Sequence, residues 1–65
     1  MQKISVKTVV DEHKVYNLKG NLIGVIYPHL CGDYWVYEYH APHSEQQIKE
    51  VLDFGKNVLG GEVKL

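Results

Sequence analysis

Residues 13–28, HKVYNLKGNLIGVIYP, hold two strand-like runs on either side of a short turn. The runs, residues 13–18 and 22–28, are rich in the aromatic and β-branched residues that favour strands. Gly20-Asn21 suits the two-residue loop of a β-hairpin, and Pro28 ends the second run because it has no N–H to donate. The stretch therefore predicts an antiparallel hairpin.

Two further strands are predicted on either side of this hairpin. Residues 3–10, KISVKTVV, alternate with the period of two that is typical of a half-buried strand. Residues 34–40, YWVYEYH, follow a turn at residues 29–33, and five of these seven residues are aromatic or β-branched. The four runs together predict an antiparallel meander.

A helix is predicted after Pro42. Ser44 and Gln47 have the spacing of a capping box, in which each side chain caps the other residue's backbone N–H. Gly60-Gly61 ends the helix, and the tail at residues 62–65 has room for a short fifth edge strand. The expected buried face of the helix consists of Ile48, Val51, Leu52, Gly55, Val58 and Leu59.

Residues 1–65 are thus expected to form one small α+β domain, a four-stranded antiparallel meander with one C-terminal helix on one sheet face (ββββα). Gly55 in mid-helix costs about 1 kcal/mol relative to alanine. We interpret it as a point of close approach to a bulky ring such as Trp35. The single cysteine, Cys31, excludes an internal disulfide.

The hairpin turns predict which side chains share a face. With Gly20-Asn21 as the loop, Tyr16 lies opposite Val25; with Tyr27 opposite Trp35, the aromatic residues of the fourth strand join that face. This first face is the predicted seat of the helix: Tyr16, Leu18, Ile23, Val25, Tyr27, Trp35, Tyr37 and Tyr39. The second face is the predicted partner-binding surface: Val15, Leu22, Ile26, Tyr34, Val36, Glu38 and His40, with Asn17 and Gly24 beside them. A one-residue slip would exchange the faces.

Composition argues against several kinds of function. The net charge is −1 and all seven basic residues are lysines, whereas a nucleic-acid-binding domain of this size is usually basic and uses arginine. No apolar run approaches the ~18 residues that a membrane span needs. The alternating N-terminus does not resemble a signal peptide, and with the lone thiol it leads us to expect a cytoplasmic protein.

Histidines 13, 29, 40 and 43, with Cys31, suggest a metal site by residue type alone. His29 and Cys31 belong to one end of the second hairpin and His40 and His43 to the other, roughly 16 Å away at ~3.3 Å per residue. We therefore expect no metal site within one chain and no cofactor; a metal held between two chains is the alternative.

Two small constellations suggest catalysis. Cys31 has a histidine two residues away, yet no nucleophile signature surrounds it. Glu38 and His40 share a strand face with Asn17 nearby, an acid–base trio that would need a concave pocket. We expect a protein that is not an enzyme.

Two stretches resemble known families. The strand–strand–strand–helix order with Gly32-x-x-Trp35 resembles the small sheet domains of phage integrases, although the basic sheet face of that family is missing. The stretch at residues 28–32, PHLCG, followed by Ser44 and a helix, is similar to the P-x-L-x-G region of HicB-type antitoxins. It departs from that family in having a full strand at residues 34–40. Both resemblances imply a nucleic-acid-binding regulator.

The first hypothesis is a small non-enzymatic interaction or inhibitor module of a phage or mobile element. It would bind a protein partner, a second copy of itself, or both through the apolar second face, because large exposed apolar patches usually mark interfaces. The alternative is the nucleic-acid-binding regulator, against which the absence of arginine counts.

Overall fold

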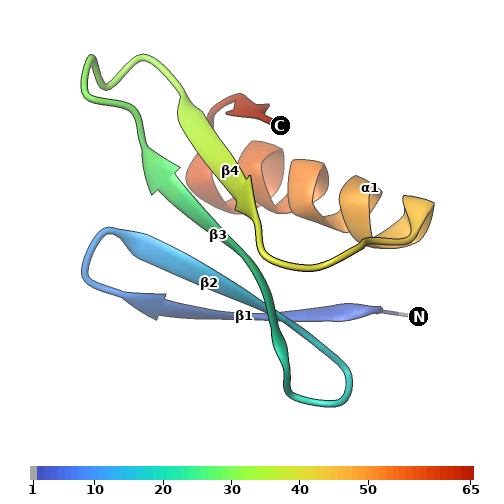
Figure 1. The fold of residues 1–65 in the computed structure, drawn as a ribbon. Coiled ribbons are helices and arrows are strands. Elements are labelled where there is room, and N and C mark those ends of the chain that lie inside the picture. The colour runs from blue at the N-terminus through green and yellow to red at the C-terminus, as the bar shows by residue number, and fades with distance from the viewer. Residues whose placement is uncertain (1) are drawn as a thin grey trace.

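The computed structural model describes residues 2–65 as a twisted sheet with one helical segment beside it (Figure 1). The meander predicted from the sequence is confirmed, as is the C-terminal helix. The elements are β1 (Ile4–Val9), β2 (Glu12–Asn17), β3 (Leu22–Pro28), β4 (Trp35–Tyr39), α1 (Glu45–Phe54), the π-helical turn η1 (Gly55–Leu59) and β5 (Val63–Lys64).

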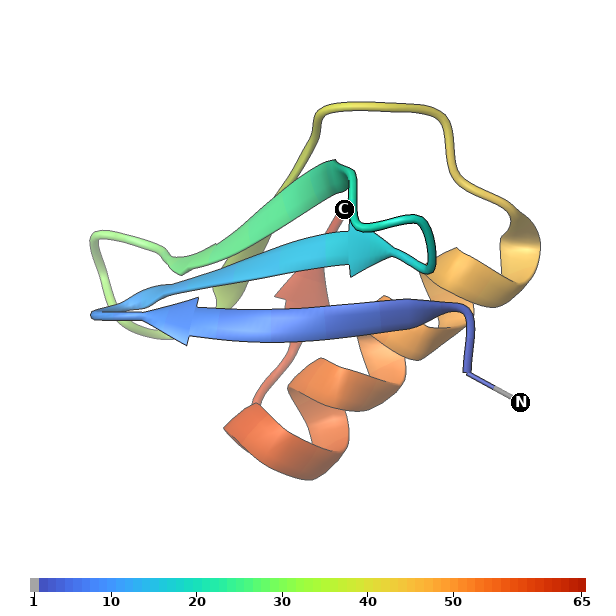
Figure 2. The ribbon, with the colours of Figure 1, turned by 90° about the horizontal axis from the view of Figure 1, so that it is seen from below.

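The five strands lie in the order in which they occur in the chain. The first four pair antiparallel, whereas β5 returns after the helix and pairs parallel with β4, Trp35 lying opposite Val63. The sheet forms one layer and the helix the other (Figure 2). In residues 2–65 no helix is long and apolar enough to cross a bilayer.

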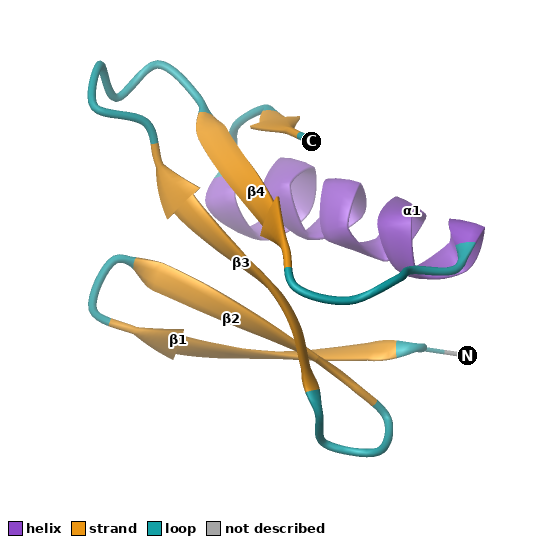
Figure 3. Ribbon diagram, viewed as in Figure 1, coloured by secondary structure: helices purple, strands orange, loops and turns teal. Residues whose placement is uncertain are grey.

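The β1–β2 turn lies one residue earlier than the alternation of residues 3–10 suggested. Strand β1 ends at Val9, and the turn consists of Val10 and Asp11. Val10 has φ 55°, a left-handed conformation that is rare for a β-branched residue. This turn lies at the same end of the sheet as the β3–β4 loop (Figure 3).

The two predicted hairpin registers are both wrong. Val15 lies opposite Gly24, two residues from the predicted pairing, and a β-bulge follows at Val15/Tyr16. Tyr27 lies opposite Val36 instead of Trp35 because the β3–β4 loop is longer than predicted and is closed by a hydrogen bond from His29 N to Tyr34 O of 3.0 Å. This one-residue slip turns each β4 side chain to the opposite face of the sheet relative to β3. Each observed face therefore combines residues from both predicted faces.

The core lies between the helix and the face that carries Val15, Ile26 and Tyr37. Both Val15 and Ile26 are 0% exposed, and Tyr37 is 3% exposed. The buried core consists of Ile4, Val15, Ile23, Ile26, Tyr37, Val51 and Val63, with Val6, Trp35, Ala41, Phe54 and Leu59 packed against it.

The helix begins with the predicted capping box. Ser44 Oγ accepts from the N–H of Gln47 at 3.2 Å, and Gln47 Oε1 accepts from the N–H of Ser44 at 2.9 Å. After Phe54 the helix widens into the π-helical turn, and Gly60 ends it with φ 69°.

The prediction of the buried helix face is only partly right. Val51 and Gly55 are buried, but Leu52 is 39% and Val58 66% exposed. Leu52 lies about 100° around the helix from Val51. Val58 lies within the π-helical turn, which rotates less per residue and so moves this side chain away from the sheet. Both side chains therefore lie on the flanks of the helix.

Gly55 is a point of close approach, but its neighbour is Val63 of β5 and not Trp35. A Cβ on Gly55 would lie 2.1 Å from Val63 Cγ2. Trp35 instead faces Gly61, where a Cβ would lie 3.2 Å from its Nε1. The glycines allow the chain after the helix to return closely beneath it and add β5.

Candidate functional site

The face of the sheet turned away from the helix has no second layer among residues 2–65 (Figure 2). Because side chains alternate along a strand, the neighbours of Val15, Ile26 and Tyr37 point to this side. We call it the open face. It carries Lys7, Val9, Glu12, Lys14, Tyr16, Val25, Tyr27, Val36, Glu38 and Lys64.

The centre of the open face is a row of three side chains across neighbouring strands. Val25 on β3 has Lys14 of β2 on one side and Glu38 of β4 on the other. Val25 is only 8% exposed although it lies outside the helix-covered core cluster. Neighbouring side chains of the open face therefore shield it, with a cation on one flank and an anion on the other.

A tyrosine and a lysine close one corner of this face. Lys64 Nζ lies 4.4 Å from the centroid of the Tyr34 ring, within the range of a cation–π interaction. The ring of His29 stacks on Tyr34 with centroids 4.5 Å apart. Tyr16, Tyr27 and Tyr34 are all half-buried, so the open face has an aromatic character as well as an apolar centre.

The predicted partner-binding residues divide between the two faces. Val15 and Ile26 are core residues beneath the helix, and their prediction as an accessible surface is wrong because of the β3–β4 register. Val36 and Glu38 lie on the open face, with Tyr34 at its corner. Leu22, 37% exposed, lies opposite Tyr16 at the β-bulge, and His40 follows the end of β4.

The acid–base trio suggested by residue type in the sequence does not assemble. Glu38 Oε1 lies 3.0 Å from His40 Nε2, with both side chains exposed to solvent, where such a pair contributes about 0–1 kcal/mol. Asn17 is occupied in the β2–β3 loop, where its Oδ1 accepts from the N–H groups of Lys19 and Asn21 at 2.9 and 3.0 Å.

His29 and Cys31 lie in one loop, but His29 does not act on the thiol. The His29 Nδ1 accepts the backbone N–H of Cys31 at 3.2 Å while the ring stacks on Tyr34. Cys31 is exposed and unbridged. Within residues 2–65 no three His, Cys, Asp or Glu side chains gather in an arrangement that could hold a metal ion.

A partly buried tyrosine–histidine pair was missed by the sequence reasoning. Tyr37 O–H lies 2.5 Å from His43 Nε2, and His43 Nδ1 lies 2.8 Å from the Ala41 carbonyl. A carbonyl only accepts, so Nδ1–H donates to it and Nε2 is free to accept from the tyrosine. Burial, with a smaller contribution from Tyr39, raises the pKa of Tyr37 well above its ordinary value.

Gly24 is the sequence signal that could have revealed this pair. A Cβ at Gly24 would lie 2.1 Å from the Tyr37 hydroxyl oxygen, so the ring occupies the space where a side chain would stand. A glycine inside a strand often marks such a close approach. The Tyr37 ring is 3% exposed and fills the space at Gly24, which indicates a packing role.

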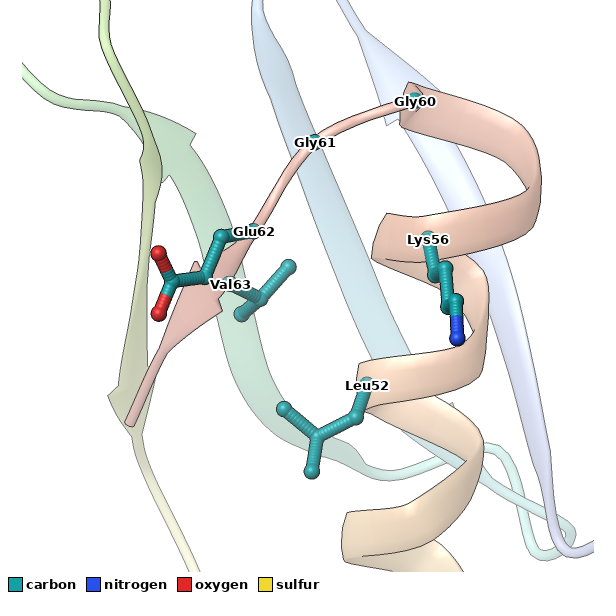
Figure 4. A pocket seen from close by; sticks show the side chains of 6 residues that line it. All are labelled: Leu52, Lys56, Gly60, Gly61, Glu62 and Val63. Carbon is teal, nitrogen blue, oxygen red and sulfur yellow. The ribbon is translucent and has the colours of Figure 1, made fainter.

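The helix leaves a groove on each flank. One lies beside β5 and is lined by Leu52, Lys56 and residues 60–63 (Figure 4). The other, of about 690 Å³, runs between β1 and the helix. Its lining residues are Gln2, Ile4, Ser5, Val6, Gln46, Glu50, Asp53, Phe54, Asn57 and Val58.

Comparison with known proteins yields no relative. No protein-family model matches the chain, no curated protein matches it, and no solved structure matches its fold. The integrase and antitoxin resemblances therefore stand on the quoted residues alone.

Proposed function

We propose that this chain is a non-enzymatic protein-interaction module that binds a second copy of itself through the open face. The observation that carries the proposal is the central row, in which Val25 is shielded between Lys14 and Glu38. Facing sheets pack through such surfaces about 10 Å apart with their strands nearly aligned.

The row is complementary to itself. If two open faces stack about a two-fold axis parallel to the strands, β2 of one copy lies over β4 of the other. Lys14 then faces Glu38 of the second copy on both sides of the axis, and the two Val25 side chains meet near it. The same patch thus supplies both halves of an isologous interface.

A charge-swap experiment tests this pairing. In sedimentation across protein concentration, the wild type is expected to reach about twice its monomer mass of 7.5 kDa. Lys14→Glu and Glu38→Lys should each weaken the dimer at least about tenfold because like charges then face each other. The double variant should restore it. A wild type that stays monomeric at high concentration, or a double variant weaker than either single one, refutes the proposal.

One observation favours nucleic-acid binding as a second candidate. Three tyrosines and three lysines lie on or beside the open face: Tyr16, Tyr27, Tyr34, Lys7, Lys14 and Lys64. Aromatic rings with nearby cations can stack and hold single-stranded nucleic acid. This candidate requires a mobility shift at low salt that weakens steeply as salt rises and is lost in Lys14→Glu. No shift at low salt eliminates it.

A further inference from the structure

The outer edge of β1 presents backbone groups that β2 does not use. The turn at Val10 and Asp11 makes Val9 and Glu12 a hydrogen-bonded pair, and such pairs alternate along an antiparallel ladder. Ile4, Val6 and Thr8 therefore direct their N–H and C=O groups away from β2. The contact of 2.8 Å between Thr8 Oγ1 and His13 Nδ1 fits this, since side chains are closer in non-hydrogen-bonded pairs.

Helix side chains form hydrogen bonds with backbone groups of this edge only near the start of β1. Both Glu50 carboxylate oxygens accept the Lys3 N–H, at 2.9 and 3.0 Å, and Gln47 Nε2 lies 3.5 Å from the Lys3 carbonyl. Within residues 2–65, no backbone hydrogen bond outside the strand pairings reaches Val6 or Thr8. The edge from Val6 to Thr8 is thus available to another strand, a state that many proteins avoid by covering or charging their edges.

The groove beside this edge has a defined chemistry. Ile4, Val6 and Phe54 are apolar and at least half-buried, and the exposed Val58 adds to the apolar wall. The only charged side chains that line the groove in residues 2–65 are Glu50 and Asp53. The neighbouring Lys56 lines the opposite flank of the helix. A segment that fills this groove would need apolar and basic side chains.

We propose that the β1 edge binds an extended peptide segment of a partner protein, with apolar and basic residues alternating on the side that faces the groove. The peptide adds an antiparallel strand to β1, and its backbone pairs with Val6 and Thr8. The peptide residues opposite Val6 and Thr8 direct their side chains to the same face as Val6 and Thr8 do. These peptide side chains therefore lie against Phe54 and Asp53. The site is separate from the open face and does not depend on self-association there.

The probe is an end-capped peptide of about seven residues in the order Thr-Arg-Thr-Leu-Thr-Arg-Thr. Its two arginines and its leucine share the side that faces the groove. In amide-resolved NMR titration of the wild type, the Val6 and Thr8 signals should shift, and their hydrogen exchange should slow more than about tenfold at saturation. Lys7, whose N–H faces β2, is the internal control. The same peptide with glutamate in place of arginine should bind at least about tenfold more weakly.

Two matched comparisons decide between edge pairing and other binding. Methylating the backbone nitrogens of the groove-facing peptide residues should abolish binding, because it removes the donors to β1 while the protein stays unchanged. Asp53→Lys should weaken binding about tenfold at low salt, whereas Asp33→Lys, with the same charge change in the β3–β4 loop, should alter it less than about twofold.

Several outcomes overturn the proposal. They are no binding at millimolar peptide, equal binding of the basic and acidic peptides, or undiminished binding of the methylated peptide. Val6→Pro tests the occupant, because proline is tolerated at an edge position whose N–H points outward. The proposal is also wrong if Val6→Pro abolishes the dimer and the peptide does not displace the dimer of the wild type. The β1 edge would then pair with a second copy of the chain.

Discussion

The two faces of the sheet carry similar aromatic and β-branched side chains, yet only one of them lies beneath the helix. Val15, Ile26 and Tyr37 are at most 3% exposed on the covered face, while Tyr16, Tyr27 and Val36 of the open face stay partly accessible. Apolar content therefore does not tell the faces apart.

Glycines that create space distinguish the covered face. Added Cβ atoms at Gly24, Gly55 and Gly61 would meet Tyr37, Val63 and Trp35. In contrast, Gly20, Gly32 and Gly60 have positive φ and nothing within 4 Å of an added Cβ. The first three glycines allow close packing and the second three allow turns, so the pattern of space-making glycines marks which face is packed.

The largest expected effect separates the faces by truncation. Ile26→Ala should lower the free energy of unfolding by about 2–5 kcal/mol, since it removes a side chain that is 0% exposed. In a domain this small, that is a large share of a total of roughly 5 kcal/mol. Val36→Ala on the open face should lower it by less than about 1 kcal/mol. Urea denaturation measures both, and equal losses would mean that the faces are packed alike.

A second prediction concerns the space beside Gly24. Gly24→Ala should lower the free energy of unfolding by about 1–3 kcal/mol, because the new methyl group overlaps the Tyr37 ring, which His43 holds in place. The loss should shrink clearly in a Tyr37→Leu background, which removes that ring. If the two substitutions are additive in denaturant unfolding, the close approach does not exist in solution.

The third prediction is a reversal of sign at Gly55. Replacing a helical glycine by alanine normally stabilises by about 1 kcal/mol. Here Gly55→Ala should destabilise instead, by about 1 kcal/mol, since its Cβ meets the Val63 Cγ2 methyl. In a Val63→Ala background the same change should stabilise. Thermal unfolding of the wild type, the two single variants and the double variant completes this double-mutant cycle. A stabilising Gly55→Ala in the wild-type background would contradict the packing of β5 beneath the helix.

Much of the fold followed from local signals in the sequence. The Ser44–Gln47 capping box and the alternation of the strands each act within a few residues, so the element order could be predicted. The two-residue Gly20-Asn21 loop is wrong, because the β2–β3 loop spans residues 18–21. The tail strand was foreseen as an edge strand, although its parallel pairing was not.

The site could be predicted less well because it depends on register. The β-bulge at Val15/Tyr16 and the length of the β3–β4 loop have no strong local signature. Yet the one-residue slip between β3 and β4 placed Tyr37 on the same face as Val15 and Ile26, and this became the face covered by the helix. Gly24 held part of the missing information, since a glycine inside a strand often marks a close approach, here that of the Tyr37 ring.

The smallest expected effect contrasts a covered tyrosine with an open one. Near neutral pH, Tyr37→Phe should lower the free energy of unfolding by about 1 kcal/mol through the lost hydrogen bond to His43. Tyr27→Phe on the open face should change it by less than about 0.5 kcal/mol.

Burial and Tyr39 raise the pKa of Tyr37 above its ordinary value of 10.0, so folding favours the protonated phenol. This contribution is fully present below pH 10 and is lost as the pH rises toward the folded-state pKa. The wild type should therefore lose stability above pH 10 more steeply than Tyr37→Phe does. Urea unfolding at a series of pH values measures the stability of both proteins. If the two lose stability equally steeply above pH 10, Tyr37 is not buried in solution.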